Sequence, residues 1–171
     1  MLQTTRLNIA PFTLADWPFI IELLNTPGWL QFIGDRNVHM EEQAKAYLTN
    51  GPLKSYADFG FGLMHVKLRA TNQSIGMCGL LKRETLPHPD LGFAFMPEFC
   101  GKGYAQEAAQ AVLHEARTKL GIQKICAIVQ PDNERSILLL KKLQFLFVNE
   151  FSFPEKTEVL ALYELTASKP I

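Results

Sequence analysis

The sequence predicts one α/β domain, or α+β by a stricter reading, with a mixed central sheet flanked by helices. Its 171 residues fit a single domain covering residues 1–171. Between residues 90 and 130, an apolar strand pattern, a long amphipathic helix pattern and a second apolar strand pattern follow one another. Such a crossover normally joins two parallel strands, whereas the hairpin patterns before and after it predict antiparallel pairs. The sheet is therefore expected to be mixed.

The first third of the chain is expected to contain one strand and two helices. The strand is expected over residues 5–10 and the helices over 13–25 and 40–50, with an irregular region at 26–39 between them. Thr13 and Asp16 have capping-box spacing, with Asp in place of Glu or Gln, although Pro18 lies too far inside for an ideal helix start. Gly51 and Pro52 are expected to end the second helix.

Alternating polarity predicts the strands in the middle of the chain. The segment 63–70 places one set of side chains on an apolar face and the other on a polar face: Met64, Val66 and Leu68 against His65, Lys67 and Arg69. A turn at 71–74 leads to a partner strand over 75–83. Residues 90–96 are apolar on both faces, as in a central strand covered on both sides.

The clearest helix follows the two glycines of "CGKGYA". Its apolar residues recur at helical spacing, and Gly121 is expected to stop it. These apolar residues are Ala105, Ala108, Ala109, Val112, Leu113, Ala116 and Leu120. After it we expect a buried strand over 124–130, a helix over 131–143, and terminal strands over 145–153 and 157–165 joined by a turn at 154–156.

Composition excludes several classes of function. Seventeen basic and seventeen acidic side chains give a formal net charge of zero, so nothing indicates a surface for nucleic acid or for an anionic membrane. Cys78, Cys100 and Cys126 are odd in number and lack CxxC spacing, which argues against a disulfide framework or a metal site and favours small buried apolar residues. No signal peptide and no apolar run of ~18 residues are visible, so a cytoplasmic protein is expected.

The stretch "MPEFCGKGYA" suggests a site for a phosphate. A helix N-terminus leaves about four N–H groups without intrahelical partners and carries a partial positive charge. Every N–H from Phe99 to Ala105 is available in principle, Gly101 and Gly103 allow positive φ, and Lys102 adds a cation. The alternative is a turn whose glycines serve only to reverse the chain. A Walker loop and a complete dinucleotide fingerprint are both absent, which disfavours a nucleotide-phosphate enzyme.

Residues 97–108, "PEFCGKGYAQEA", resemble the acyl-CoA pyrophosphate loop of the GNAT N-acetyltransferase superfamily, and most of all its branch of ribosomal-protein N-terminal acetyltransferases. Three further segments resemble that branch in the correct order: 4–16, 75–99 and 130–145. The resemblance implies a single-domain GNAT-like fold in which two central strands splay apart to admit acetyl-CoA.

The resemblance also implies which residues meet the cofactor. The pantetheine arm is expected to pair with backbone around Phe95 and Met96, and the phosphates to lie on the loop amides. Those loop residues are Cys100, Gly101, Lys102, Gly103, Tyr104 and Ala105. Asn133 and Ser136 match positions near the pantetheine arm or the sulfur; otherwise they are a helix cap and a solvated helix face. Lys102, Arg135, Lys141 and Lys142 are expected to meet the negative charges of coenzyme A.

Acetyl transfer needs a deprotonated amine, a stabilised oxyanion and a stabilised thiolate. Asp90, at the place where many relatives carry Glu, is the candidate base, with Glu84 and His88 as alternatives. A backbone N–H near Met96 is the candidate oxyanion donor. Leu140 occupies the place of the acidic Tyr found in many members, and Gln144 that of a frequent Gly. In the ribosomal-protein branch a Ser at the position of Ser136 is the proposed acid, so the resemblance implies Ser136 as the candidate acid.

The function expected from the sequence is acetyl transfer from acetyl-CoA directly to a primary amine, with a protein N-terminal α-amine among the candidates. Partners are acetyl-CoA and a peptide or small-amine acceptor, with no metal; the chain is expected to be a monomer or homodimer. The acceptor site is expected from 29–39, 51–60 and the last hairpin, with Trp29, Phe32, Asp35 and Arg36 shaping it. The alternative is a non-catalytic acyl-CoA-binding or sensing module on the same fold.

Overall fold

The computed structural model describes residues 1–153 and 157–166, so the turn expected at 154–156 lies outside the described residues. Within the described residues, eight strands form one sheet in the order β1-β2-β3-β4-β5-β6-β8-β7. The strands are β1 Leu2–Gln3, β2 Leu7–Pro11, β3 Leu63–Leu68, β4 Ser74–Leu81, β5 Asp90–Phe95, β6 Lys124–Val129, β7 Leu146–Phe151 and β8 Leu160–Thr166. Only β5 and β6 pair in parallel, and the other neighbours are antiparallel. The predicted mixed sheet is confirmed.

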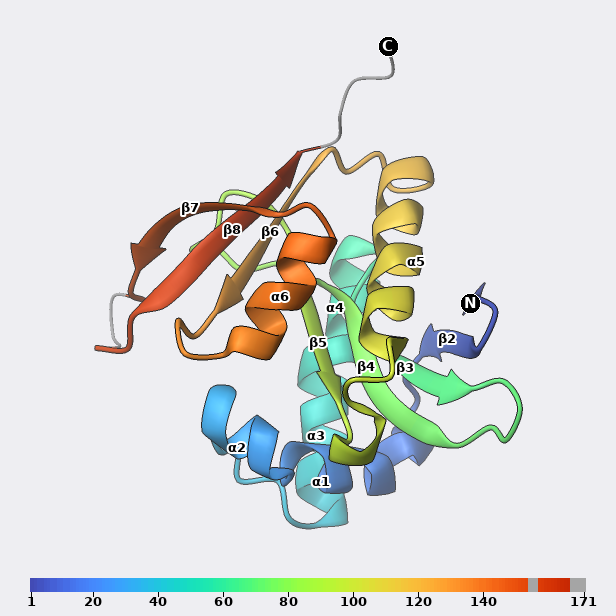
Figure 1. Ribbon diagram of the computed structural model, residues 1–171. Helices are drawn as coiled ribbons and strands as arrows, with labels where there is room; N and C mark the ends of the chain where they lie inside the picture. Colours follow the sequence, from blue (N-terminus) through green and yellow to red (C-terminus); the bar gives the residue numbers. More distant parts are fainter. Residues whose placement is uncertain (154–156, 167–171) are drawn as a thin grey trace.

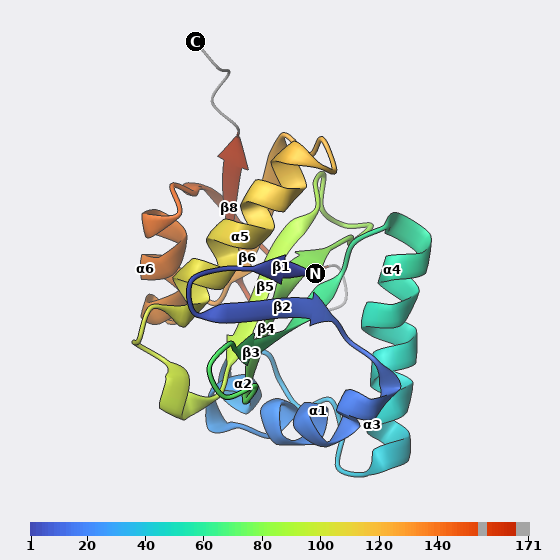
Figure 2. The same cartoon turned by 90° about the vertical axis from the view of Figure 1, so that its right-hand side faces the viewer.

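Helices cover both faces of this sheet. The α-helices are α1 Trp17–Leu24, α2 Pro27–Phe32, α3 Glu41–Leu48, α4 Lys54–Phe59, α5 Tyr104–Thr118 and α6 Glu134–Lys142, with short 3-10 turns η1 Leu14–Asp16 and η3 Pro97–Phe99 and a π-helical turn η2 Thr49–Leu53. Figure 1 shows α5 and α6 in front of the sheet, and Figure 2 shows the α1–α4 group on its other face. The sheet thus separates two hydrophobic cores.

The helix after the glycines forms where its pattern predicted. Its small buried side chains, Ala108, Ala109 and Ala116, let α5 pack closely on β4 and β5. Gly121 has φ +67 just beyond the helix end, as expected of a residue that stops a helix. Leu120, expected on the apolar face, is instead 40% exposed because α5 ends before it.

The segment 26–59 differs most from the expectation. The region predicted as irregular contains α2, which Thr26 caps by accepting a hydrogen bond from the N–H of Trp29. The helix expected to end at Gly51 and Pro52 runs on through η2 into α4. A π-helical turn widens the helix where Pro52 cannot donate a hydrogen bond, so the chain continues instead of breaking.

The first predicted helix begins with a separate 3-10 turn, η1, before α1. Asp16 accepts hydrogen bonds from the N–H and hydroxyl of Thr13, at 2.8 and 3.0 Å, so the predicted capping contact forms around η1. Because α1 begins only at Trp17, Pro18 lies in its first turn, where a missing N–H costs nothing.

Two predictions about burial were wrong. His65, assigned to a polar face, is 3% exposed because the α1 side covers it; its ring stacks between Phe12 and Phe19 at centroid distances of 4.8 and 4.7 Å. Cys78 and Cys126 are buried as expected, but Cys100 is exposed at the edge of a cleft.

Candidate active site

The central parallel pair is joined at one position only. Asp90 pairs with Cys126, whose N–H donates to the carbonyl of Pro89 at 2.8 Å. Beyond this point the strands diverge (Figure 1). They open a cleft of about 2100 Å³ lined by β5, β6, the loop before α5 and the start of α6. The predicted splaying is confirmed, and the gap exposes one peptide edge from each strand.

The peptide groups on the β5 edge differ from those expected. The N–H of Met96 donates to the carbonyl of Ile75 on the β4 side, at 2.9 Å. Because peptide groups of successive residues in a strand point to opposite edges, the N–H and C=O of Phe93 and Phe95 point toward β6 instead. The candidate donor for the oxyanion and for the pantetheine arm therefore shifts from Met96 to these two residues.

The loop at the cleft mouth presents a run of N–H groups. Those of Phe99 and Cys100 are used within the η3 turn, by the carbonyls of Met96 and Pro97 at 3.0 and 3.1 Å. The first bond of α5 runs from the Glu107 N–H to the Gly103 carbonyl. Within residues 1–153 and 157–166, the six N–H groups from Gly101 to Gln106 donate no hydrogen bond. These six groups form an N–H cradle. The sequence suggested a run from Phe99 to Ala105, so the cradle begins two residues later and ends one residue later than expected.

Positive φ at both glycines creates this cradle. Gly101 has φ +76 and Gly103 has φ +81, which are conformations that other residues adopt only at a cost. Gly103 also lies close to Arg6, because a Cβ added there would be 3.3 Å from an Arg6 Nη. Both glycines therefore have the backbone conformation that the turn into α5 requires.

Most of the predicted cofactor residues come together in the cleft. Those that line it are Phe95, Cys100, Gly101, Gly103, Ala105, Asn133 and Ser136. Three do not line it. Met96 packs on the α1–α4 side, the Lys102 ammonium lies 5.6 Å from the centre of the Phe99 ring, and Tyr104 packs against the α5 core. Lys102 and Tyr104 thus contribute peptide groups to the cradle, not side chains to the cleft.

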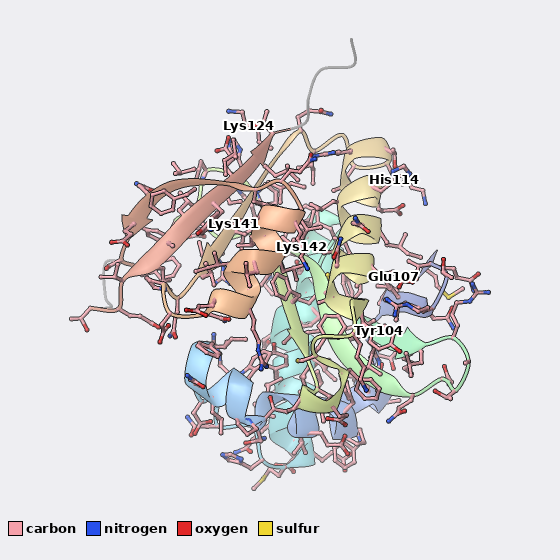
Figure 3. All side chains as sticks on the ribbon, viewed as in Figure 1. Tyr104, Glu107, His114, Lys124, Lys141 and Lys142 are labelled. Carbon is pink, nitrogen blue, oxygen red and sulfur yellow. The ribbon has the colours of Figure 1, made fainter. Side chains whose placement is uncertain are left out.

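The loop is held by a clamp that no sequence pattern predicted. Glu107 accepts hydrogen bonds from the Thr4 hydroxyl at 2.6 Å, the Arg6 N–H at 2.8 Å and Arg6 Nε at 2.6 Å. Arg6 also donates to the carbonyl of Lys102 at 3.0 Å, and its guanidinium lies 4.4 Å from the centre of the Tyr104 ring. Figure 3 shows Tyr104 and Glu107 at the first turns of α5, facing the N-terminal strands. An acidic residue in a first helical turn was the only sequence signal.

Asp90 lies at the apex of the cleft, the closed end where β5 and β6 still pair, and is 1% exposed. Arg83 Nε lies 3.1 Å from each of its carboxylate oxygens. Burial raises the pKa of Asp90, and the neighbouring Arg83 opposes that rise without cancelling it. A carboxylate with a raised pKa is a better proton acceptor than an exposed one. Of the alternative bases, Glu84 lines the cleft and His88 does not.

The start of α6 forms the opposite wall. Asn133 caps this helix by accepting a hydrogen bond from the Ser136 N–H at 3.2 Å, so the cap interpretation is correct for Asn133 while its side chain also faces the cleft. The Ser136 hydroxyl makes no hydrogen bond with the described residues. Leu140 is 1% exposed in the core beneath, so this position supplies packing and no acid.

Two of the expected cations reach the cleft. Arg135 and Lys142 line it, whereas Lys102 and Lys141 do not. Figure 3 shows that α6, which carries Lys141 and Lys142, lies beside α5. Burial raises the pKa of the Cys100 thiol, and the charge of Arg135 works against this rise.

The expected acceptor segments line the far side of the same cleft. Phe32 and Arg36 face it, and so do parts of η2, α4 and the last hairpin. Trp29 also contributes to the wall, although it is mainly a core residue at 5% exposure. Asp35 does not line the cleft; its carboxylate accepts a hydrogen bond from the Asn37 N–H at 2.7 Å.

A sheet parted between two parallel strands, with an N–H cradle at the mouth of the gap, is the arrangement that the resemblance to the GNAT superfamily implied for a coenzyme A thioester. The family model described as an acetyltransferase (GNAT) domain matches residues 6–146. An uncharacterized N-acetyltransferase of Bacillus subtilis, YnaD, is 30% identical over 142 residues, which are 83% of this chain and 80% of that protein. The chain therefore belongs to the GNAT acetyltransferase family.

Solved structures share the fold at low identity. The ribosomal L7/L12 α-N-protein acetyltransferase RimL, in complex with coenzyme A, has a TM-score of 0.83 at 16% identity, with 96% of each chain covered. The spermidine N-acetyltransferase SpeG of Vibrio cholerae has a TM-score of 0.74 at 19% identity, covering 97% of this chain and 96% of that one. This chain thus shares its fold with a member of the branch that the sequence resembles. The protein is an acetyl-CoA-dependent acetyltransferase that acts on an amine.

Two further observations concern the described residues only. None of their helices combines the length and apolar character needed to cross a bilayer. They contain no group of three or more His, Cys, Asp or Glu side chains placed to hold a metal ion.

Proposed function

We propose that the whole chain is one acetyltransferase domain that moves an acetyl group from acetyl-CoA directly to a primary α-amine, such as a protein N-terminus. The observation that carries this proposal is the open β5–β6 gap with its unused N–H groups from Gly101 to Gln106. A diphosphate on these groups would place the pantetheine arm along the free edge of β5. The thioester would then lie near Phe93, next to the apex.

Asp90 is the proposed base. An α-amine has a pKa near ~8 and a Lys side chain one near ~10.4, so deprotonating the α-amine costs about 3 kcal/mol less. A buried carboxylate with a raised pKa is matched to the easier of these tasks, directly or through one water. Arg83 holds the carboxylate in place with its Nε.

The oxyanion and the leaving thiolate would be met from opposite walls. The N–H of Phe93 on the β5 edge is the proposed donor to the thioester oxygen, and the peptide groups of Phe95 are the proposed partners of the pantetheine arm. The Ser136 hydroxyl, on the α6 wall, is the proposed donor to the departing sulfur. Acetyl-CoA supplies the activated acyl group, and the chain supplies alignment, a proton acceptor and these donors.

Thiol release from acetyl-CoA, with an amine panel and mass analysis of the products, tests the proposal. The panel contains peptides with a free N-terminus, the same peptides with a blocked N-terminus and one lysine, polyamines and amino sugars. Turnover is expected with the free N-termini and little with the blocked peptides. Coenzyme A binding without turnover across the panel would instead favour the non-catalytic module, and turnover only with polyamines would exclude the α-amine.

A further inference from the structure

The peptide group between Lys102 and Gly103 belongs to the N–H cradle and is held from one side only. Its carbonyl, which belongs to Lys102, accepts a hydrogen bond from Arg6 Nη1 at 3.0 Å. Its N–H, which belongs to Gly103, donates no hydrogen bond to any described residue. Because this peptide bond is trans, its carbonyl and its N–H point in opposite directions. The Gly103 N–H therefore points away from the Arg6 guanidinium.

The two sides of this loop have different surroundings. Gly103 lines the cleft, whereas Arg6 and Lys102 do not. The Arg6 guanidinium lies 4.4 Å from the centre of the Tyr104 ring, which packs against the α5 core. Arg6 thus holds the carbonyl on the side away from the cleft, and the N–H of the same peptide group is left for the cleft side.

Arg6 is itself fixed, so the direction of its Nη1 is set. One carboxylate, that of Glu107, accepts both the Arg6 backbone N–H at 2.8 Å and Arg6 Nε at 2.6 Å. The Thr4 hydroxyl donates to the same carboxylate at 2.6 Å. Burial alone would raise the pKa of Glu107, but these donors and the Arg6 charge outweigh it and lower the pKa. The carboxylate is therefore ionised at neutral pH, and the planar guanidinium that it holds presents Nη1 to the loop.

Without this contact the peptide group has a second orientation available. Gly103 has φ +81, and glycine adopts negative φ about as readily as positive φ. A flip of the peptide group would turn the N–H toward Arg6 and the Lys102 carbonyl toward the cleft. A carbonyl oxygen on that side would repel a phosphate, and a guanidinium cannot accept the N–H because it has donors only. Arg6 therefore favours the orientation that leaves a donor for the cleft.

We propose that Arg6 is a positioning residue for the co-substrate, which holds the Lys102 carbonyl away from the cleft and so keeps the Gly103 N–H directed at the diphosphate of acetyl-CoA. This inference rests on the proposed placement of the diphosphate on the N–H cradle. Arg6 acts through the peptide group and not by contact with the phosphate, because it does not line the cleft. A charge-assisted hydrogen bond at the carbonyl also polarises the peptide group, which makes its N–H a stronger donor.

Calorimetry with coenzyme A, and with pantetheine, which lacks the diphosphate, tests this role. Arg6→Met should bind coenzyme A roughly tenfold more weakly, the size expected for one hydrogen bond to a charged group, and should bind pantetheine as the wild type does. Equal losses for both ligands would overturn the inference. If the wild type prefers coenzyme A and Arg6→Met keeps the full preference, the cradle stands and only the role of Arg6 fails. A wild type without any preference would refute the cradle and the role of Arg6 together.

Two further variants separate orientation from stability and from charge. Arg69→Met removes a comparable hydrogen bond, from Arg69 Nη1 to the Thr4 carbonyl at 2.7 Å, and should keep the wild-type affinity for both ligands. Arg6→Lys keeps the positive charge but loses the planar fork whose separate nitrogens meet Glu107 and Lys102. It should still bind coenzyme A several-fold more weakly, and it carries the test if Arg6→Met does not fold. Full affinity in Arg6→Lys would show that charge alone matters and would overturn the inference.

The Gly103 amide reports the orientation directly. In the wild type, saturation with coenzyme A should slow its hydrogen exchange and shift its NMR resonance. In saturated Arg6→Met both responses should be smaller, whereas Gly101, which makes no hydrogen bond with Arg6, should respond as in the wild type. An identical Gly103 response in the two proteins would overturn the inference even if the affinity falls. None of these measurements requires acetyl transfer, so their outcome is independent of which amine is the acceptor.

Discussion

Burial of His65 predicts a specific loss of stability in mild acid. The ring is 3% exposed, its Nδ1 lies 3.1 Å from an Asp16 oxygen, and its Nε2 is buried without a hydrogen-bond partner among the described residues. Burial lowers the pKa of His65 from 6.5 to about 4, against the attraction of Asp16. Protonating the folded state would put a charge between two phenyl rings, with no acceptor for the second N–H.

Proton linkage gives the sign and size of the effect. The unfolded chain takes up the proton near pH 6.5, whereas the folded chain does so only near pH 4. Between these values the unfolded state binds more protons, so the free energy of unfolding falls as the pH is lowered. A difference of about 2.5 pKa units corresponds to a loss of about 3 kcal/mol in the free energy of unfolding. This loss is complete by about pH 4 and absent above about pH 6.5.

Urea unfolding at several pH values, followed by tryptophan fluorescence, measures this slope. The control is His65→Asn, whose amide can still donate to Asp16 but does not titrate. Asp16 does not change the slope between pH 6.5 and 4, because its pKa is lowered and its contribution to stability is lost only at lower pH. Asp90, with its raised pKa, acts in the opposite direction but equally in both proteins. The reasoning fails if the wild type and His65→Asn lose stability in parallel between pH 6.5 and 4.

Four other outcomes are expected. Glu107→Gln should weaken coenzyme A binding by calorimetry about two- to fivefold, because the partly exposed ion pair between Arg6 and Glu107 contributes ~0.5–1 kcal/mol to holding the loop; unchanged affinity would show that this ion pair is not needed for loop geometry. Gln144→Gly should raise Tm by about 2–4 °C, since Gln144 has φ +67, a strain of ~1–2 kcal/mol that glycine relieves at some entropic cost; a lower Tm would refute this. Amide hydrogen exchange should slow at Phe95 when coenzyme A binds, whereas Met96 should be protected already, and the reverse order would contradict the register of β5. Ser136→Ala should keep acetyl-CoA affinity within a few-fold and lower kcat, roughly tenfold for one lost hydrogen bond to charge; unchanged kcat at saturating amine would remove Ser136 from the mechanism.

The sequence predicted those parts of the molecule that depend on local chemistry. The pattern of β5, α5 and β6, the positive φ at Gly101 and Gly103 and the cap at Asn133 all result from short-range rules. Each requires only the residue and its near neighbours in the chain. The parting of the strands was implied by the family resemblance, which covers the same segment.

The features that were missed depend on residues far apart in the chain. Arg6 and Glu107 are 101 positions apart, and nothing near either one indicates the clamp. His65 looked polar because alternation identifies two faces of a strand but does not say that α1 covers the second. Pro52 looked like a helix end because proline usually stops a helix, whereas here a π-helical turn lets the chain continue into α4.

The division of labour in the cleft explains why the cofactor was easier to predict than the acceptor. Coenzyme A would be met mainly by peptide groups, on the β5 edge and in the cradle from Gly101 to Gln106, and their positions are set by the fold. The gap itself is stable because β5 pairs with β4, and β6 with β8, at all six positions on their other edges. The expected acceptor segments instead line the cleft with side chains such as Phe32 and Arg36, carried outside the sheet. Substitutions there need not disturb either half of the sheet, so relatives with this fold can share the cofactor and still differ in the amine they accept.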